Sequence, residues 1–245
     1  MGQHGKYRPL VRLFGLSLIL GMLLALPASA CRLALVLALD VSASVDGDED
    51  RLQRNGLADA LLAEDVQDAF FVSPDPVALA VFDWSGPSAQ TKILPWVLIE
   101  EPSQLQQVSD IIRQSRRITR ADMTALGLAL RYGINLLAER PECFAHTIDV
   151  SGDGKNNSGF SPRMIYNSMP FDGITVNGLV INVEGADRKE GLIDYFEQRV
   201  IRGPASFVEE AKGFEDYGNA MRRKLIRELS SFAIGGLETA LPPPG

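Results

Sequence analysis

Histidine is nearly absent from this chain, which has only His4 and His146 among its 245 residues. His4 lies in a segment that we expect to be removed, and His146 lies in an apolar run that is typical of a β-strand. A multi-histidine zinc site or a histidine-based catalytic triad would therefore rest on a single residue. This scarcity disfavours both kinds of site and favours a structural role for His146.

Positive charge is also scarce, since 24 Lys and Arg stand against 31 Asp and Glu, for a net charge of −7. No stripe of basic residues stands out in the sequence, and contacts with nucleic-acid phosphates require clustered positive charge. We therefore expect no nucleic-acid partner. Ser-rich linkers, long charge runs and repeats are lacking too, which predicts one large domain.

The chain has no apolar run long enough to span a bilayer comfortably. Its longest run, residues 14–26, follows three basic residues and precedes Ala28-Ser29-Ala30. A basic start, an apolar core and small residues are typical of a signal peptide. We expect residues 1–30 to be removed on export, which makes the protein a periplasmic or secreted bacterial protein with no transmembrane segment in its mature chain.

Apolar runs and helical patterns alternate along most of the remaining chain. Near-continuous apolar strands separated by helices predict a mostly parallel sheet with helices on both faces. Pro95 makes one strand an edge strand, because proline cannot donate a backbone hydrogen bond. The fold class is therefore α/β, a Rossmann-like doubly wound sheet of about six strands. The predicted strands are 33–39, 77–84, 93–99, 144–150, 174–183 and 205–210, and the predicted helices are 46–63, 103–116, 124–138, 162–169, 192–200 and 214–231.

The C-terminal residues 235–245 contain Gly235-Gly236 and Pro242-Pro243-Pro244. Proline cannot extend a helix or a central strand. We therefore expect a flexible Pro- and Gly-rich tail over residues 235–245.

Polar side chains follow the first predicted strand in the pattern Asp-x-Ser-x-Ser, formed by Asp40, Ser42 and Ser44. Alternate residues of an extended segment share one side, so one carboxylate and two hydroxyls can point toward a common centre. Hard divalent cations take such oxygen ligands, and Mg²⁺ needs few of them because it keeps several waters. The alternative is a helix N-cap, in which Ser44 or Asp46 would accept hydrogen bonds from backbone amides.

Two other segments supply further oxygen atoms. Thr124 lies where a polar loop meets a predicted helix, and Asp153 follows a predicted strand between Gly152 and Gly154. Ligands of such folds bind at the carboxyl ends of the strands. The three segments together favour a metal site over an N-cap.

These three motifs, in this order on alternating strands and helices, resemble the metal-ion-dependent adhesion site (MIDAS) of the von Willebrand factor type A (VWA) domain. The resemblance implies a VWA-like domain over residues 31–234, with the strand order 3-2-1-4-5-6 and an antiparallel edge strand. Three shorter blocks, residues 31–40, 148–154 and 176–179, are similar to an exported bacterial VWA-like family of unknown function, domain of unknown function 1194.

The resemblance also implies a role for each residue. Ser42 and Ser44 would bind the metal directly, Asp40 and Asp153 directly or through water, and Thr124 in the ligand-binding state. Mg²⁺ is the expected ion, with Mn²⁺ or Ca²⁺ as alternatives, and an acidic side chain of a protein partner would complete its coordination. One departure from the family lies just before Thr124, where Ala-Asp-Met replaces a segment that often contains glycine.

These expectations describe a protein-binding module that is not an enzyme. A metal-dependent hydrolase is an alternative, since a metal flanked by carboxylates can activate water. A structural scaffold with a non-functional metal site is a further alternative.

Cysteine is as scarce as histidine, with only Cys31 and Cys143. Export to an oxidising compartment permits them to pair. Cys31 lies nine residues before Asp40 and Cys143 ten before Asp153, so two aspartates at one metal would place the cysteines near the other ends of neighbouring strands. Because such strands lie about 4.8 Å apart, we expect a Cys31–Cys143 disulfide. The alternative is a lipid anchor on Cys31.

Three polar residues near the motifs have two interpretations each. Asp149 lies inside the strand before Asp153 and can face the site or a helix N-terminus, and we favour a structural role. Asn156 and Asn157 either order the loop over the metal or form an ordinary turn.

Overall fold

The computed structural model describes residues 1–2, 31–118, 121–183 and 191–238. Most of the predicted signal peptide, residues 3–30, and residues 239–245 of the predicted tail lie outside the described residues. Within the described part, no helix combines the length and the apolar character that crossing a membrane requires.

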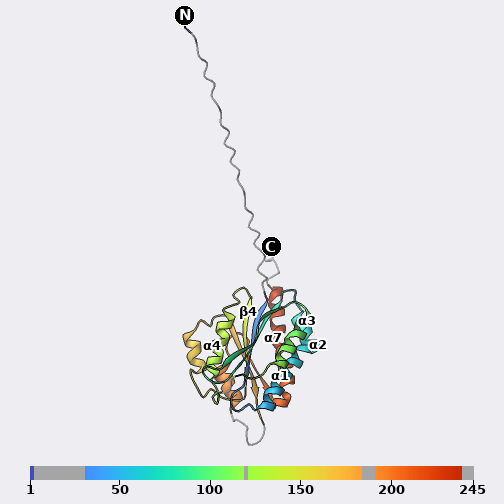
Figure 1. The fold of residues 1–245 in the computed structure, drawn as a ribbon, viewed down its shortest axis with the longest axis vertical. Helices are drawn as coiled ribbons and strands as arrows, with labels where there is room; N and C mark the ends of the chain where they lie inside the picture. Colours follow the sequence, from blue (N-terminus) through green and yellow to red (C-terminus); the bar gives the residue numbers. More distant parts are fainter. Residues whose placement is uncertain (3–30, 119–120, 184–190, 239–245) are drawn as a thin grey trace.

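Six strands form one sheet in the described part of the chain (Figure 1): β1 (Leu33–Asp40), β2 (Val77–Trp84), β3 (Gln90–Ile99), β4 (Ala145–Gly152), β5 (Ile174–Ile181) and β6 (Val208–Ala211). Their order is β3-β2-β1-β4-β5-β6. All neighbours pair in parallel except β2 and β3, which are antiparallel. The predicted α/β class, the strand order and the antiparallel edge strand are therefore confirmed.

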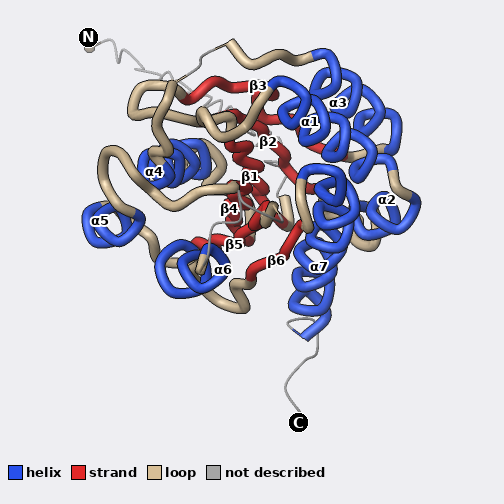
Figure 2. Tube along the Cα trace, turned by 90° about the horizontal axis from the view of Figure 1, so that it is seen from below, coloured by secondary structure: helices blue, strands red, loops and turns tan. Residues whose placement is uncertain are grey.

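Helices cover both faces of the sheet, as Figure 2 shows. One face carries α1 (Gly47–Leu62), α2 (Glu64–Phe70), α3 (Pro102–Gln114) and α7 (Tyr217–Glu238), and the other carries α4 (Leu126–Leu137), α5 (Pro162–Ser168) and α6 (Leu192–Tyr195). The sheet is thus the middle of three layers, and the central strands are shielded from water on both sides.

The central strand β1 shows why the sequence produces these layers. All eight of its residues are buried. Successive side chains of a strand point to opposite faces, so Leu35 and Leu37 join the core beneath α1 and α7, while Val36 and Ala38 join the core beneath α4. Because both faces are covered, the strand appears in the sequence as a continuous apolar run and not as an alternating one.

Several element boundaries differ from the sequence-based expectation. The short helix α2 was not predicted, and the predicted helix 192–200 is divided into α6 and a π-helix, Phe196–Val200. The last strand covers Val208–Ala211 and not 205–210. These segments are four to seven residues long, too short for hydrophobic periodicity to define their type or ends.

The predicted tail begins too early. Helix α7 continues to Glu238, past Gly235 and Gly236, where we expected the chain to leave the helix. A glycine in a helix costs about 1 kcal/mol, so it weakens a helix without ending it, whereas proline ends it. The first four residues of the predicted tail are therefore helical.

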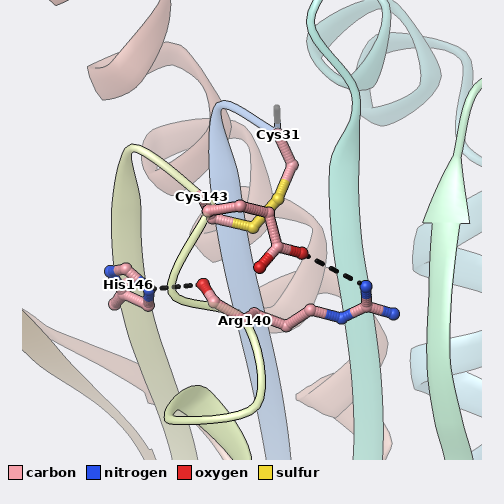
Figure 3. Close-up of a disulfide and its surroundings, with 5 residues drawn as sticks. Cys31, Arg140, Cys143 and His146 are labelled. Atoms are coloured by element: carbon pink, nitrogen blue, oxygen red, sulfur yellow. Dashed lines mark hydrogen bonds and ion pairs between the residues drawn. A yellow bond between two sulfur atoms is a disulfide. The ribbon is translucent and has the colours of Figure 1, made fainter. Parts of the chain in front are cut away.

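A disulfide joins Cys31 and Cys143 at the amino ends of β1 and β4 (Figure 3). The two Cα atoms are 4.4 Å apart, and the bridge spans a sequence separation of 112 residues. This is the pairing that the register argument predicts. A sulfur that is bonded to another cysteine cannot carry a thioether-linked lipid, so the structure favours the bridge over the lipid anchor.

His146 lies at the same end of the sheet, close to the disulfide (Figure 3). Its Nε2 atom donates a hydrogen bond to the carbonyl oxygen of Arg140, at 2.9 Å. The histidine thus ties the segment before β4 to the strand itself, which is a structural role and lies at the opposite end of the sheet from the predicted metal site.

Candidate metal centre

The first half of the candidate site is a tight turn directly after β1. Asp40 is the last residue of the strand, and its Oδ1 atom accepts a hydrogen bond from the backbone N–H of Ser42 at 2.8 Å. The N–H of Val45 donates to the carbonyl oxygen of Ser42 at 3.0 Å, which turns the chain toward α1. The Asp40 side chain thus stabilises the turn that follows it, as Asp side chains often do.

The second half follows β4, the neighbouring strand. Asp153 comes directly after Gly152, the last residue of β4. The hydroxyl of Ser44 donates to Asp153 Oδ1 at 2.8 Å, and the hydroxyl oxygens of Ser42 and Ser44 are 3.4 Å apart. The structure therefore brings four of the five predicted residues into one chain of contacts, from Asp40 through the two serines to Asp153.

The close packing around position 152 explains why a glycine occupies it. A Cβ atom at this position would lie 3.2 Å from Asp40 Oδ2 and 3.5 Å from the ring of Phe196. A side chain here would crowd the carboxylate that ends β1. The glycine therefore lets the two carboxyl-terminal strand ends approach each other closely.

Thr124 lies on the opposite wall of the site, just before α4. Its backbone N–H donates to Asn157 Oδ1 at 2.8 Å, and the N–H of Asn157 donates back to the carbonyl oxygen of Thr124 at 2.9 Å. A hollow of about 260 Å³ opens between this pair and the loop after β1, and both Ser44 and Thr124 line it. Thr124 shares a space with Ser44, although no hydrogen bond joins their side chains.

The two asparagines after Asp153 fix the loop to α4. Asn157 holds Thr124, and the Oδ1 atom of Asn156 accepts a hydrogen bond from the N–H of Gly127 at 3.0 Å. These contacts fit the first of the two interpretations given by the sequence, in which the asparagines order the loop beside the candidate site.

Sequence reasoning missed one residue, Arg117. Its guanidinium group donates to the carbonyl oxygens of Val41 at 3.2 Å and Val45 at 2.8 Å. These two carbonyls flank the Ser42–Ser44 segment, so Arg117 braces the loop from outside. The only sequence signal was a pair of arginines in the polar loop before Thr124, which by itself suggests a solvated loop.

The burial of the site suits a hard cation that is reached from one side. Asp40, Ser42 and Asp153 are at most 3% exposed, whereas Ser44 is exposed at the mouth of the hollow. The available donors are carboxylate and hydroxyl oxygens, which Mg²⁺, Mn²⁺ and Ca²⁺ prefer. Two carboxylates also match the charge of a divalent ion. The residues present therefore fit a divalent metal.

Asp149 is not part of this arrangement. Its Oδ1 atom lies 2.8 Å from Nζ of Lys224 on α7, and Nζ also lies 2.6 Å from Oε1 of Glu228. The three side chains are almost completely buried. Burial is the main cause that raises the pKa of the Asp149 carboxyl to about 7, Glu228 raises it further and Lys224 opposes the shift. Asp149 therefore has the structural role that we favoured.

The architecture of this chain is similar to that of several solved structures. Solved structures with the same fold include proximal thread matrix protein 1 from the mussel byssus with a zinc-occupied MIDAS motif (16% identity, TM-score 0.58, covering 82% of this chain and 46% of that chain). The pilus adhesin SpaC from Lactobacillus rhamnosus GG in an open conformation is similar (15% identity, TM-score 0.57, covering 84% and 30%). So is a von Willebrand factor type A structure from Catenulispora acidiphila (12% identity, TM-score 0.58, covering 83% and 43%).

At such low sequence identities the similarity shows the fold alone, and this fold is VWA-like. This chain spans less than half of the length of each of these three proteins. No curated protein matches the sequence at a significant level. The chain belongs to the family described as "Protein of unknown function (DUF1194)", which matches residues 30–233.

Proposed function

We propose that this chain is an exported VWA-like module that binds an acidic group of a protein partner through a Mg²⁺-centred site, with Asp40, Ser42, Ser44, Thr124 and Asp153 as its ligands. The observation that carries the proposal is the hydrogen bond between Ser44 and Asp153. It joins the loops after β1 and β4 at the point where Asp40 and Ser42 already meet.

The proposed role of each ligand follows from its burial and its hydrogen bonds. Asp40 and Asp153 supply negative charge from the buried part of the site, where the Ser42 hydroxyl adds a neutral oxygen, and Ser44 supplies a second hydroxyl at the surface. When bound, the metal would supply a positive centre that attracts a carboxylate from the partner. The hollow between Ser44 and Thr124 gives that carboxylate a path to the site.

The comparisons support a metal and a partner without naming either for this chain. One protein of the same fold has a MIDAS motif occupied by zinc, and another is a pilus adhesin. We propose Mg²⁺ for this chain because its ligands are all oxygen atoms, with Mn²⁺ or Ca²⁺ as alternatives. The disulfide supports an exported protein, since such bridges persist in oxidising compartments.

We propose binding and not catalysis because no histidine in the described part of the chain lies beside the hydroxyls of the site. Ser44 donates to Asp153, and His146 is engaged with Arg140 at the other end of the sheet. A serine nucleophile is normally activated by a neighbouring base such as histidine. Turnover of a panel of phosphoesters in the presence of Mg²⁺ would contradict this part of the proposal.

Calorimetric titration with Mg²⁺ tests the site itself. We expect wild type to bind one ion, and Asp40→Ala and Asp153→Ala to lose binding. Ser44→Ala, at an exposed position that leaves the core intact, should weaken binding without affecting folding. Asp172→Ala, at an exposed aspartate outside the site, is the matched control and should bind as wild type does. Equal binding by all of these proteins would contradict the proposal.

Partner capture tests the binding role. The mature protein, immobilised and exposed to periplasmic extract, should retain a partner in Mg²⁺ that is released by chelation. The same partner should be absent from a column carrying Asp40→Ala. A partner that binds equally to both columns and in chelator would contradict a metal-centred mode of recognition.

A further inference from the structure

A second concave site lies away from the candidate metal centre, between α5 and the π-helix Phe196–Val200. It has a volume of about 330 Å³, at the lower end of the range for small-molecule sites. Six of its seven lining residues have polar side chains, namely Arg163, Tyr166, Asn167, Gln198, Arg199 and Arg202, and the seventh is Ile201. None of the five residues that we predicted as metal ligands lines this pocket.

The charge of this pocket is opposite to that of the molecule. Three arginines line it and no acidic side chain does, although the whole chain has a net charge of −7. Arg163, Arg199 and Arg202 have no carboxylate within 4 Å among the residues that the structure describes. Six arginines elsewhere in the described part pair with carboxylates: Arg51, Arg54, Arg113, Arg140, Arg222 and Arg223. The pocket is thus a concentration of positive charge without internal compensation.

Aromatic rings hold one of these arginines in place. The guanidinium carbon of Arg202 lies 5.2 Å from the ring centre of Tyr166 and 5.5 Å from that of Phe171. A cation stacked on aromatic faces is stabilised without a counter-charge, so its N–H groups stay available for a ligand. The backbone of Arg202 is fixed as well, through hydrogen bonds of 2.7 Å and 3.1 Å with Val176.

The π-helix builds the other wall. Its defining hydrogen bond runs from the N–H of Ile201 to the carbonyl oxygen of Phe196 at 2.9 Å, and its residues Gln198 and Arg199 line the pocket. The hydroxyl of Tyr166 donates to the carbonyl oxygen of Val200 and so ties α5 to this segment. Short π-helical segments are rare and occur frequently at functional sites.

We propose that this pocket binds a compact anion with at least two negative charges, of which phosphate-bearing small molecules are the best-fitting class. The planar guanidinium forks of Arg163, Arg199 and Arg202 match phosphate oxygens in bidentate geometry. The amides of Asn167 and Gln198 can donate to further oxygens of the same ligand. This site is independent of the metal centre and needs no metal.

Inorganic pyrophosphate in metal-free buffer is the direct probe, because the absence of divalent ions removes any contribution from the metal centre. Titration calorimetry at low ionic strength should detect binding to wild type. Arg163→Gln and Arg199→Gln, both at exposed positions that leave the core intact, should each weaken it about tenfold or more, the loss expected for a charged hydrogen-bonding group. Arg131→Gln, at an exposed position on α4, removes the same charge elsewhere and should leave the affinity unchanged.

Citrate in a parallel titration distinguishes a phosphate-bearing ligand from a polycarboxylate, the other common compact anion with several negative charges. Tighter binding of pyrophosphate than of citrate would support the phosphate class. Citrate binding as tightly would overturn that class while the loss in Arg199→Gln still located an anion site. The proposal is contradicted if wild type binds neither probe at millimolar concentration, or if Arg131→Gln weakens binding as much as Arg163→Gln does.

Discussion

Two aspartates four residues apart, Asp149 and Asp153, lie in and just after β4 and have different surroundings. Both are nearly inaccessible to water, with exposed fractions of 1% and 3%. Asp149 faces the ammonium group of Lys224 on α7, at 2.8 Å. Asp153 lies beyond the end of the strand and accepts a hydrogen bond from the hydroxyl of Ser44, at 2.8 Å.

The difference shows that position along the strand decides which neighbours these two buried carboxylates have. Inside the sheet, the neighbouring helix can supply a fixed counter-charge, and the carboxylate serves packing. At the carboxyl end, the neighbours are loops that supply hydroxyls, and the carboxylate of Asp153 contacts Ser44, which lines a hollow that opens to the surface. We expect removal of Asp149 to change stability and removal of Asp153 to change metal binding.

Replacing Lys224 should have the largest effect. Lys224→Met leaves Asp149 and Glu228 buried beside each other without a cation, which should lower the free energy of unfolding by about 3–5 kcal/mol. Urea unfolding measured by circular dichroism tests this. The triple variant Lys224→Met, Asp149→Asn, Glu228→Gln removes the charges as well and should recover much of the loss. A single variant as stable as wild type would show that the cation does not neutralise this region.

The pH dependence of stability should single out Asp149. Its pKa is raised to about 7 in the folded protein, against about 3.9 in the unfolded chain. Its contribution to stability is therefore fully present below about pH 4 and is lost as the pH rises through 7. Asp149→Asn lacks this pH-dependent contribution to the free energy of unfolding. Wild type should therefore lose stability relative to the variant between pH 5 and 7.5, by at most about 1.4 kcal/mol per pH unit.

Urea unfolding of both proteins at a series of pH values measures this difference. Asp153→Asn serves as the control for removal of a buried carboxylate from the same chain segment. A difference between wild type and Asp149→Asn that is constant with pH would contradict the assignment of the raised pKa to Asp149.

The smallest effect should come from Arg117, which acts on the metal centre through the loop that it braces. Arg117→Gln removes two hydrogen bonds from a partly exposed side chain, so the free energy of unfolding should fall by about 1 kcal/mol or less. The dissociation constant for Mg²⁺ should rise several-fold, because the serines flanked by Val41 and Val45 are held less firmly. Calorimetry measures it, with Arg131→Gln as the control. Unchanged Mg²⁺ affinity would remove Arg117 from the site.

Much of the fold could be predicted because its strands are buried on both faces. Runs such as 33–39 and 77–82 are apolar without interruption, and Pro95 identifies the edge strand from the chemistry of one residue. The missed helix α2 lies directly after α1 and has few apolar residues, so no periodic pattern marks it. The end of α7 was misplaced because glycine weakens a helix without ending it.

The candidate site could be predicted for a similar reason, since its residues follow strand ends that the sequence already marks. The side chains that hold the surrounding structure in place could not be predicted. Arg117 acts through backbone carbonyls, which have no signature in the sequence. Lys224 resembles a solvated residue of an amphipathic helix, and only the three-dimensional structure shows that it faces Asp149 with no exposed surface.

The different roles of the two aspartates can be compared in one experiment, which measures the Mg²⁺-induced shift of the thermal unfolding midpoint in wild type, Asp149→Asn and Asp153→Asn. An ion present at a hundred times its dissociation constant stabilises by about 2.7 kcal/mol, or about 5–10 °C for a domain of this size. We expect this shift in wild type and Asp149→Asn, and none in Asp153→Asn. A full shift in Asp153→Asn would contradict the assignment of Asp153 as a metal ligand.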